Sequence, residues 1–177
     1  MKTTTLNKIR DCAPCADGWA KLLKYLGKTA ADDEPISFIT ILESNGLDDA
    51  LWCYHAAPRY YREWRLYAVW CARQVQHLTI DPRSIAAIDV AERYANGRAT
   101  EAELAAARVA ARIAAWATPV AELTARAAGE AARSAEWGAE EEEDGEMIRA
   151  AAWAEMAGAA VTEQYTKFRD IVSGEAV

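Results

Sequence analysis

The chain lacks any long apolar run, because Arg or Glu interrupts each of its alanine-rich stretches. A helix that crosses a membrane needs about 20 predominantly apolar residues, so no transmembrane helix is expected. The first residues, MKTTTLNKIRDCAPC, also lack the apolar core of a secretory signal peptide. We therefore expect a cytoplasmic protein whose four cysteines stay reduced.

The chain also lacks an excess of positive charge. Its 20 Lys and Arg residues stand against 27 Asp and Glu, which gives a net charge of −7 and a pI of about 5.0. Proteins that bind DNA or RNA usually gather Lys and Arg on one face, so direct nucleic-acid binding is not expected. The acidic balance favours a protein partner and leaves open an acidic mimic of nucleic acid that blocks a DNA-binding protein.

Sequence motifs of the common enzyme classes are missing as well. The chain has no GxSxG, no HExxH and no glycine-rich phosphate-binding loop. Its only histidines are His55 and His77, and both are predicted to lie at helix ends or on the surface rather than beside a nucleophile. We expect a protein without catalytic residues and without a cofactor.

Alanine is what the chain has in abundance. Forty of the 177 residues are alanine, and most lie between Ala86 and Ala160. Alanine loses no side-chain entropy in a helix, so such runs form helices readily, and no strand-length alternation of β-branched residues is present. The sequence predicts a single all-α domain, a compact bundle of about seven or eight helices. Its parts are an N-terminal helical half over 1–80, an Ala-rich half over 81–172 and a frayed tail over 173–177.

Proline, glycine and apolar spacing predict the helix boundaries of the first half. Pro14 is expected to open a helix that ends at Gly27. A polar connector over 29–35 then precedes short helices over 36–44 and 47–55. The inner face of the first helix is expected to hold Trp19, Leu22, Leu23 and Leu26. A longer helix follows, whose inner stripe at three-and-four spacing is Tyr61, Trp64, Ala68, Cys71, Val75 and Leu78.

Capping residues mark two helix starts in the second half. Asp81 is expected to cap a helix that begins at Pro82 and ends at Asn96-Gly97. Thr100 and Glu103 have the spacing of a capping box, which predicts another helix start. The first of these helices should bury Ile85, Ile88, Ala91 and Ala95. The second should bury Val109, Ile113 and Trp116, and the same spacing continues to Val120 and Leu123.

The remainder of the second half is predicted from a proline and an acidic run. The chain is expected to break at Thr118-Pro119, although a kink at Pro119 is the alternative. Residues 138–145 (GAEEEEDG) are expected to form a loop before a last helix over 146–172. The inner face of that helix is expected to hold Trp153, Ala157, Val161, Tyr165, Phe168 and Val172.

Two stretches carry a family resemblance. Residues Ile9–Cys53, with the words APCADGWAKLLKYLGKT, ADDEP and ILESNGLDDALWC, and Arg65–Gly97 resemble uncharacterised Ala/Trp-rich helical proteins of tailed phages and prophages. The central region is also similar to helical "immunity protein" domains, in its arrangement of Trp70, Cys71, Ala72, Asp81, Arg83, Ala86, Ala91 and Gly97. The phage class has no assigned activity, so the resemblance implies no site residues. The immunity domains imply a small protein that neutralises another protein by binding it.

A cluster of tyrosines and arginines is the first candidate for a partner surface. Tyr, Trp and Arg are the residue types enriched at interface hot spots. Tyr61 and Trp64 belong to the predicted buried stripe, so the surface candidates are Arg59, Tyr60, Arg62 and Arg65. The alternative is Arg stacked on Tyr as ordinary packing. A second candidate, for a basic partner, is the acidic run Glu140, Glu141, Glu142 and Glu143, whose alternative is a solvated loop.

Cys12 and Cys15 form a CxxC, a spacing typical of a redox pair or of half a zinc site. Redox chemistry in the thioredoxin manner needs a βαβ setting, which the sequence does not predict. Cys53 and His55 would complete four zinc ligands, but two positions apart on a helix they point about 200° from one another. Ordinary packing is the alternative for these cysteines.

Taken together, these patterns predict a non-enzymatic protein, phage- or prophage-encoded, that neutralises or modulates a host or toxin protein by stoichiometric binding. The alternatives are the nucleic-acid mimic and a small zinc-stabilised helical protein. A homodimer built on the Ala-rich helices is as compatible with the sequence as a monomer.

Overall fold

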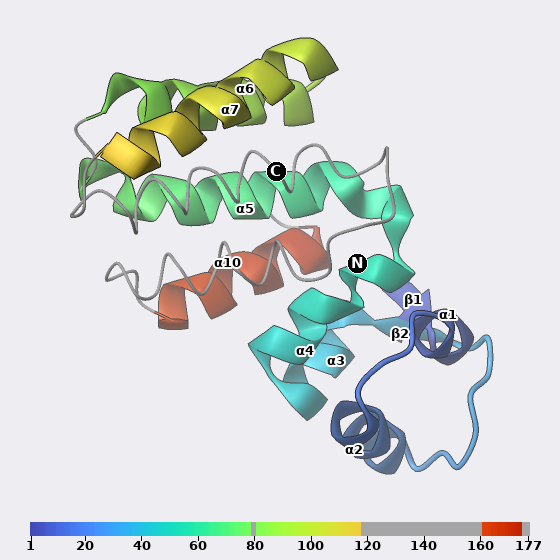
Figure 1. Ribbon diagram of the computed structural model, residues 1–177. Helices are drawn as coiled ribbons and strands as arrows, with labels where there is room; N and C mark the ends of the chain where they lie inside the picture. The colour runs from blue at the N-terminus through green and yellow to red at the C-terminus, as the bar shows by residue number, and fades with distance from the viewer. Residues whose placement is uncertain (79–80, 118–160, 175–177) are drawn as a thin grey trace. The chain divides into compact units, whose positions relative to one another are not determined.

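The structure, a computed structural model, describes residues 1–78, 81–117 and 161–174 (Figure 1). Over these ranges the chain is all-α, as predicted, with eight α-helices and one pair of three-residue strands. None of the helices in these ranges is long and apolar enough to span a bilayer. The chain divides into two compact units, which are described separately: unit 1 is Met1–Tyr60 with Phe168–Val177, and unit 2 is Tyr61–Lys167.

Unit 1 begins with a strand pair that the sequence did not predict. Strand β1 (Thr3–Thr5) runs antiparallel to β2 (Pro35–Ser37), with Thr4 opposite Ile36. Each strand is too short to show an alternating pattern, and the two are brought together from distant parts of the chain. Threonine suits a strand, and proline is tolerated at a strand's first position. The predicted helix start at residue 36 is therefore wrong, and the connector ends one residue before Pro35.

The helices of unit 1 otherwise follow the predicted boundaries closely. The helix expected at Pro14 begins at Ala16, because Cys15 is its N-cap, and it ends at Gly27 with φ 65°. On its inner face Leu22 is buried, and the other predicted residues are half-buried. The helix expected to reach residue 55 ends in a 3-10 turn instead. The bounds are α1 (Leu6–Asp11), α2 (Ala16–Leu26), α3 (Phe38–Asn45) and α4 (Leu47–Trp52), with 3-10 turns at Cys53–Ala56 and Pro58–Tyr60.

The two ends of the described chain meet in unit 1. Helix α10 (Val161–Ser173) contributes Phe168, whose ring lies 6.5 Å from that of Phe38 in an edge-to-face contact. The backbone N–H of Lys2 donates to the carbonyl of Val172 at 2.7 Å, and its Nζ donates to the carbonyl of Ile171 at 2.9 Å. Phe168 and Val172 are buried as predicted.

One residue of the predicted α10 inner face is placed wrongly. Val161 is 47% exposed, whereas Ile171, which was not on the predicted face, is buried. The buried part of the helix therefore begins later, and its face is centred on neighbouring positions.

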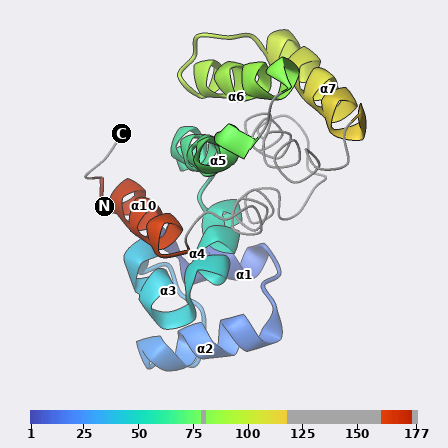
Figure 2. The same cartoon turned by 90° about the vertical axis from the view of Figure 1, so that its left-hand side faces the viewer.

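The part of unit 2 that the structure describes up to Ala117 contains three long helices, of which α6 and α7 lie side by side (Figure 2). The predicted stripe of the first is confirmed at Trp64, Ala68, Cys71 and Val75, which are buried, whereas Tyr61 is only half-buried. The bounds are α5 (Tyr61–Val75), a 3-10 turn at Gln76–Leu78, α6 (Pro82–Ala95) and α7 (Glu101–Ala117).

Both predicted caps in unit 2 are confirmed. The Asp81 carboxylate accepts the backbone N–H of Arg83 at 2.9 Å. The Thr100 backbone N–H donates to Glu103 Oε2 at 2.7 Å, and the Glu103 N–H donates to Thr100 Oγ1 at 3.2 Å. These reciprocal bonds satisfy amides that a helix start leaves without intrahelical partners.

The buried face of α7 differs from the predicted one. Leu104 and Ala111 are fully buried, whereas Val109 is 45% exposed and Ile113 is 55% exposed. The prediction placed the bulkiest aliphatic residues inside. On α6 the prediction holds better: Ile88, Ala91 and Ala95 are buried as expected and Ile85 is half-buried, while Ser84 and Ala87 are buried as well. The buried positions of these two helices are thus mostly small residues, which allow close backbone approach. On α7 the choice of the bulkiest side chains therefore misidentified the inner face.

Several predictions fall outside the described residues. They concern the break at Pro119, the loop over 138–145 and the start of the last helix. The inner-face residues among them are Val120, Leu123, Trp153 and Ala157, and the side chains of Leu78 and Trp116 are also outside.

The capping box makes the start of α7 sensitive to acid. Hydrogen bonds from the Thr100 backbone amide and hydroxyl hold the pKa of Glu103 below its ordinary value. Since the folded-state pKa is depressed, the stabilisation is present at neutral pH and is lost as the pH falls below about 4. We expect the wild type to exceed Glu103→Gln in melting temperature at about pH 6, and this gap to close near pH 3. Thermal unfolding, monitored by circular dichroism at each pH, measures this difference in melting temperature.

The matched control is Glu101→Gln, which removes a carboxylate from the same first turn of α7. The difference in melting temperature between Glu101→Gln and the wild type should change less with pH. A Glu103→Gln gap that stays constant down to pH 3 would contradict the assignment.

Candidate functional site

The predicted cluster of tyrosines and arginines is divided between the two units. Arg59 and Tyr60 end the first stretch of unit 1, whereas Arg62 and Arg65 lie in the first turns of α5 in unit 2. Each pair is therefore described with the residues of its own unit.

Arg59 and Tyr60 hold strand β1 in place. The Nη2 of Arg59 donates to the carbonyl of Thr3 at 2.8 Å and to its Oγ1 at 3.0 Å, and the guanidinium lies 4.7 Å from the Tyr60 ring centroid. The backbone N–H of Thr3 donates to the Tyr60 hydroxyl at 3.3 Å. Burial raises the pKa of Tyr60, but the hydrogen bonds with Thr3 and the charge of Arg59 outweigh it and lower that pKa overall. These contacts give both residues a role in packing.

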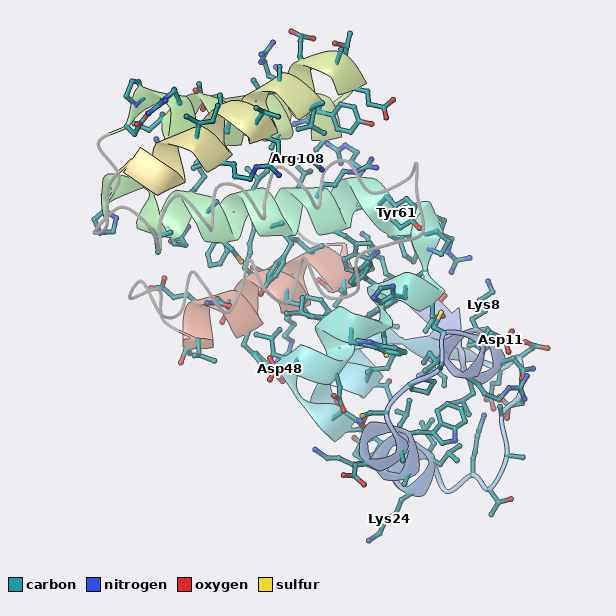
Figure 3. All side chains as sticks on the ribbon, viewed as in Figure 1. Lys8, Asp11, Lys24, Asp48, Tyr61 and Arg108 are labelled. Carbon is teal, nitrogen blue, oxygen red and sulfur yellow. The ribbon has the colours of Figure 1, made fainter. Side chains whose placement is uncertain are left out.

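Arg65 lies between two aromatic rings of unit 2. Its guanidinium carbon is 5.7 Å from the ring centroid of Tyr61 and 5.3 Å from that of Tyr94. Beside it, the exposed Arg62 donates from Nη2 to Oδ1 of Asn96 at 2.8 Å. We call Tyr61, Arg62, Arg65 and Tyr94 the Tyr/Arg surface. Figure 3 labels Tyr61 at the start of α5.

Desolvation is the main electrostatic effect at the Tyr/Arg surface. Burial lowers the pKa of Arg65, while Tyr94 and Tyr61 act in the opposite direction. An arginine remains protonated at physiological pH even so. The surface therefore carries two positive charges on half-buried or exposed side chains, next to two aromatic rings that are half-buried.

Sequence reasoning missed Tyr94, a member of the Tyr/Arg surface, and Asn96, the hydrogen-bond partner of Arg62. The short connection between α5 and α6 could have identified these two residues, because a short connection makes neighbouring helices antiparallel. In such a pair the last turn of α6 lies next to the first turn of α5. That is where the Arg62–Asn96 hydrogen bond forms.

The four proposed zinc ligands are not assembled into a metal site. Cys15 is exposed, Cys12 is half-buried and Cys53 is buried. The ring of His55 stacks on Tyr54 at 4.1 Å between centroids. Across the described ranges no three His, Cys, Asp or Glu side chains are grouped so that they could hold a metal ion. Cys12, Cys15, Cys53 and His55 therefore do not form a group that could bind a metal ion.

Burial dominates the chemistry of the two interior cysteines. It raises the pKa of Cys53, and the nearby Asp49 and Cys12 raise it further. Burial also raises the pKa of Cys71 to about 12. Both side chains therefore remain protonated thiols at neutral pH, in agreement with the predicted core positions.

The other candidates are placed simply. His77 is exposed in the 3-10 turn after α5, at a helix end as predicted. The acidic run Glu140, Glu141, Glu142 and Glu143 lies outside the described residues.

Comparison with protein-family models, with curated proteins and with solved structures finds no match to this chain. The resemblance to phage proteins thus stays a prediction, and any functional argument depends on the geometry described above.

Proposed function

We propose that this protein acts by stoichiometric binding to another protein rather than by catalysis, and that the Tyr/Arg surface of unit 2 is its contact. The observation that supports this most is the position of Arg65 between the rings of Tyr61 and Tyr94. Arginine and tyrosine are among the residue types that dominate binding energy at interfaces.

Pre-ordering of the arginines favours binding further. A free arginine side chain carries about 2 kcal/mol of rotamer entropy. The two rings beside Arg65 and the hydrogen bond from Arg62 to Asn96 restrict these side chains before any partner arrives. Less entropy is therefore lost on association, which raises affinity.

The charge of the surface indicates the chemistry of the partner. Arg62 and Arg65 lie three positions apart on α5, on a chain whose net charge is −7. Guanidinium groups pair well with carboxylates, often through two parallel hydrogen bonds. We propose an acidic contact residue on the partner, and we propose as partner a host or toxin protein that a phage-encoded protein of this kind neutralises or modulates.

The test is affinity capture with a matched charge control. The tagged full chain is expressed in its natural host as wild type, as Arg62→Glu and as Lys24→Glu, the last of which changes an exposed lysine of unit 1 (Figure 3). We expect the wild type and Lys24→Glu each to capture one partner protein in nearly the same molar amount as the tagged chain. Arg62→Glu should capture at least about tenfold less of that partner. Quantitative mass spectrometry measures the molar ratio of the captured partner to the tagged chain.

Two outcomes would overturn the proposal. Capture of no protein by the wild type argues against a stoichiometric binder. Equal capture by Arg62→Glu and by Lys24→Glu argues against the Tyr/Arg surface as the contact.

A further inference from the structure

Helix α7 carries a line of exposed apolar residues opposite its buried face. Ala102, Ala106, Val109 and Ile113 follow steps of four, three and four, so they share one face of the helix. Both alanines are exposed, Val109 is 45% exposed and Ile113 is 55% exposed. The fully buried Leu104 lies on about the opposite side of the helix, at about 100° per residue. We call the four exposed residues the α7 stripe.

The side-chain sizes along the α7 stripe are complementary to those of a second copy of the same stripe. Its small residues lie toward the N-terminus of the helix and its large ones toward the C-terminus. A twofold axis perpendicular to the helix, between Ala106 and Val109, makes two copies antiparallel. It places Ala102 level with the partner's Ile113 and Ala106 level with the partner's Val109. Each large side chain then meets a small one, which lets the two helices approach closely.

The charges beside the α7 stripe favour the same antiparallel arrangement. Glu101 and Arg112 are exposed and lie on the same flank of the stripe, about 80–110° from its line. The twofold axis brings these flanks together, and Glu101 of each copy then lies about 3 Å along the axis from the partner's Arg112. A parallel pair would instead bring Glu101 beside the partner's Glu103. Like charges there are unfavourable, so the charges select the antiparallel pair.

We propose that the α7 stripe is the contact of a symmetric, antiparallel homodimer of this chain. The sequence is compatible with a homodimer but does not identify its face, whereas the exposure of Val109 and Ile113 does so. Interfaces that bury less than about 1,200 Å² are usually weak, and one helix pair is a small interface. The net charge of −7 on each copy adds repulsion. We therefore expect a dissociation constant of about 10–100 μM.

The homodimer is independent of the proposed binding function, because the α7 stripe and the Tyr/Arg surface share no residue. Failure of one therefore leaves the other standing. A dimer carries two Tyr/Arg surfaces, so the ratio of one partner protein to one chain is the same for the monomer and the dimer.

The test is sedimentation velocity of the full-length chain between about 1 and 200 μM. We expect the wild type to shift from a 19.4 kDa monomer to a dimer across this range. Ile113→Glu should raise the dissociation constant at least about tenfold, because twofold symmetry places the added carboxylate in the interface twice. The matched control is Ala86→Glu, which adds the same charge at an exposed position of α6 and should dimerise like the wild type.

A charge exchange tests the orientation of the two helices. Arg112→Glu should raise the dissociation constant about threefold to tenfold, because it replaces an attraction with a repulsion in both copies of the contact. The double variant Glu101→Arg/Arg112→Glu should restore dimerisation, since the two opposite charges are then only exchanged. Both positions are exposed, so these variants keep the packing of α7.

Three results would overturn the proposal. A wild type that stays monomeric over the whole concentration range would show that the α7 stripe does not bind a second copy. Equal dimerisation by Ile113→Glu and by Ala86→Glu would place the dimer contact elsewhere. A double variant that dimerises no better than Arg112→Glu would contradict the antiparallel pair.

Discussion

Replacement of Phe168 by alanine is expected to destabilise unit 1 by about 3–5 kcal/mol, the range found when a fully buried aromatic residue is truncated. The ring is completely buried and meets Phe38, also completely buried, in an edge-to-face contact. Truncation removes that contact and leaves a cavity that the rigid surroundings fill only in part. The effect should be confined mainly to unit 1, because Phe168 belongs to that unit.

Hydrogen exchange followed by mass spectrometry resolves this effect by region. Peptides from residues 1–60 should lose protection in Phe168→Ala. The matched control on the same helix is Val161→Ala, because Val161 is 47% exposed. Exposed positions usually change stability by no more than about 0.5 kcal/mol. Equal loss of protection in the two variants would contradict the packing described for α10.

Replacement of Leu104 by alanine is expected to destabilise unit 2 by about 2–5 kcal/mol, since the side chain is fully buried. It lies in the first turn of α7, directly after the capping-box residue Glu103. Loss of its contacts should loosen the packing of α7.

The control for Leu104 tests which face of α7 is inside. Val109→Ala and Ile113→Ala change aliphatic side chains that are about half exposed, so each should cost clearly less than Leu104→Ala. Urea unfolding of the three variants gives the comparison. If the valine or isoleucine variant lost as much stability as the leucine variant, the face predicted from the sequence would be the inner one.

The sequence predicts best where the determining interactions are local. The Asp81 cap and the Thr100–Glu103 capping box bring together residues two or three positions apart, so the pattern alone places them. The end of α2 at Gly27 follows from the ability of glycine to adopt a positive φ.

Prediction fails where distant segments or side-chain size decide. The pairing of Thr4 with Ile36 depends on two short strands meeting across a long separation, and neither strand carries a pattern of its own. On α7, Ala111 rather than the larger Ile113 is buried. Hydrophobicity ranks those residues in the opposite order, since it does not account for how closely two helices approach.

The candidate site could be predicted only in part for the same reasons. Arg62 and Arg65 are recognisable by residue type, but Tyr94 becomes a neighbour only when α6 returns alongside α5. Arg59 and Tyr60 are of the same residue types as the Tyr/Arg surface, yet they bind Thr3, because strand β1 lies against them.

Unit 1 combines two stretches that lie far apart in the sequence, and this has a consequence for synthesis on the ribosome. Phe38 is made 130 residues before its ring partner Phe168. At a synthesis rate of about 5–20 residues per second, the nascent chain waits roughly 6–26 seconds between the two. During that interval α5, α6 and α7 emerge in succession and can pair through contacts close in sequence. The segment that contains Phe38 meanwhile lacks the side chain that completes its core, so unit 1 can finish folding only after α5, α6 and α7 have been made.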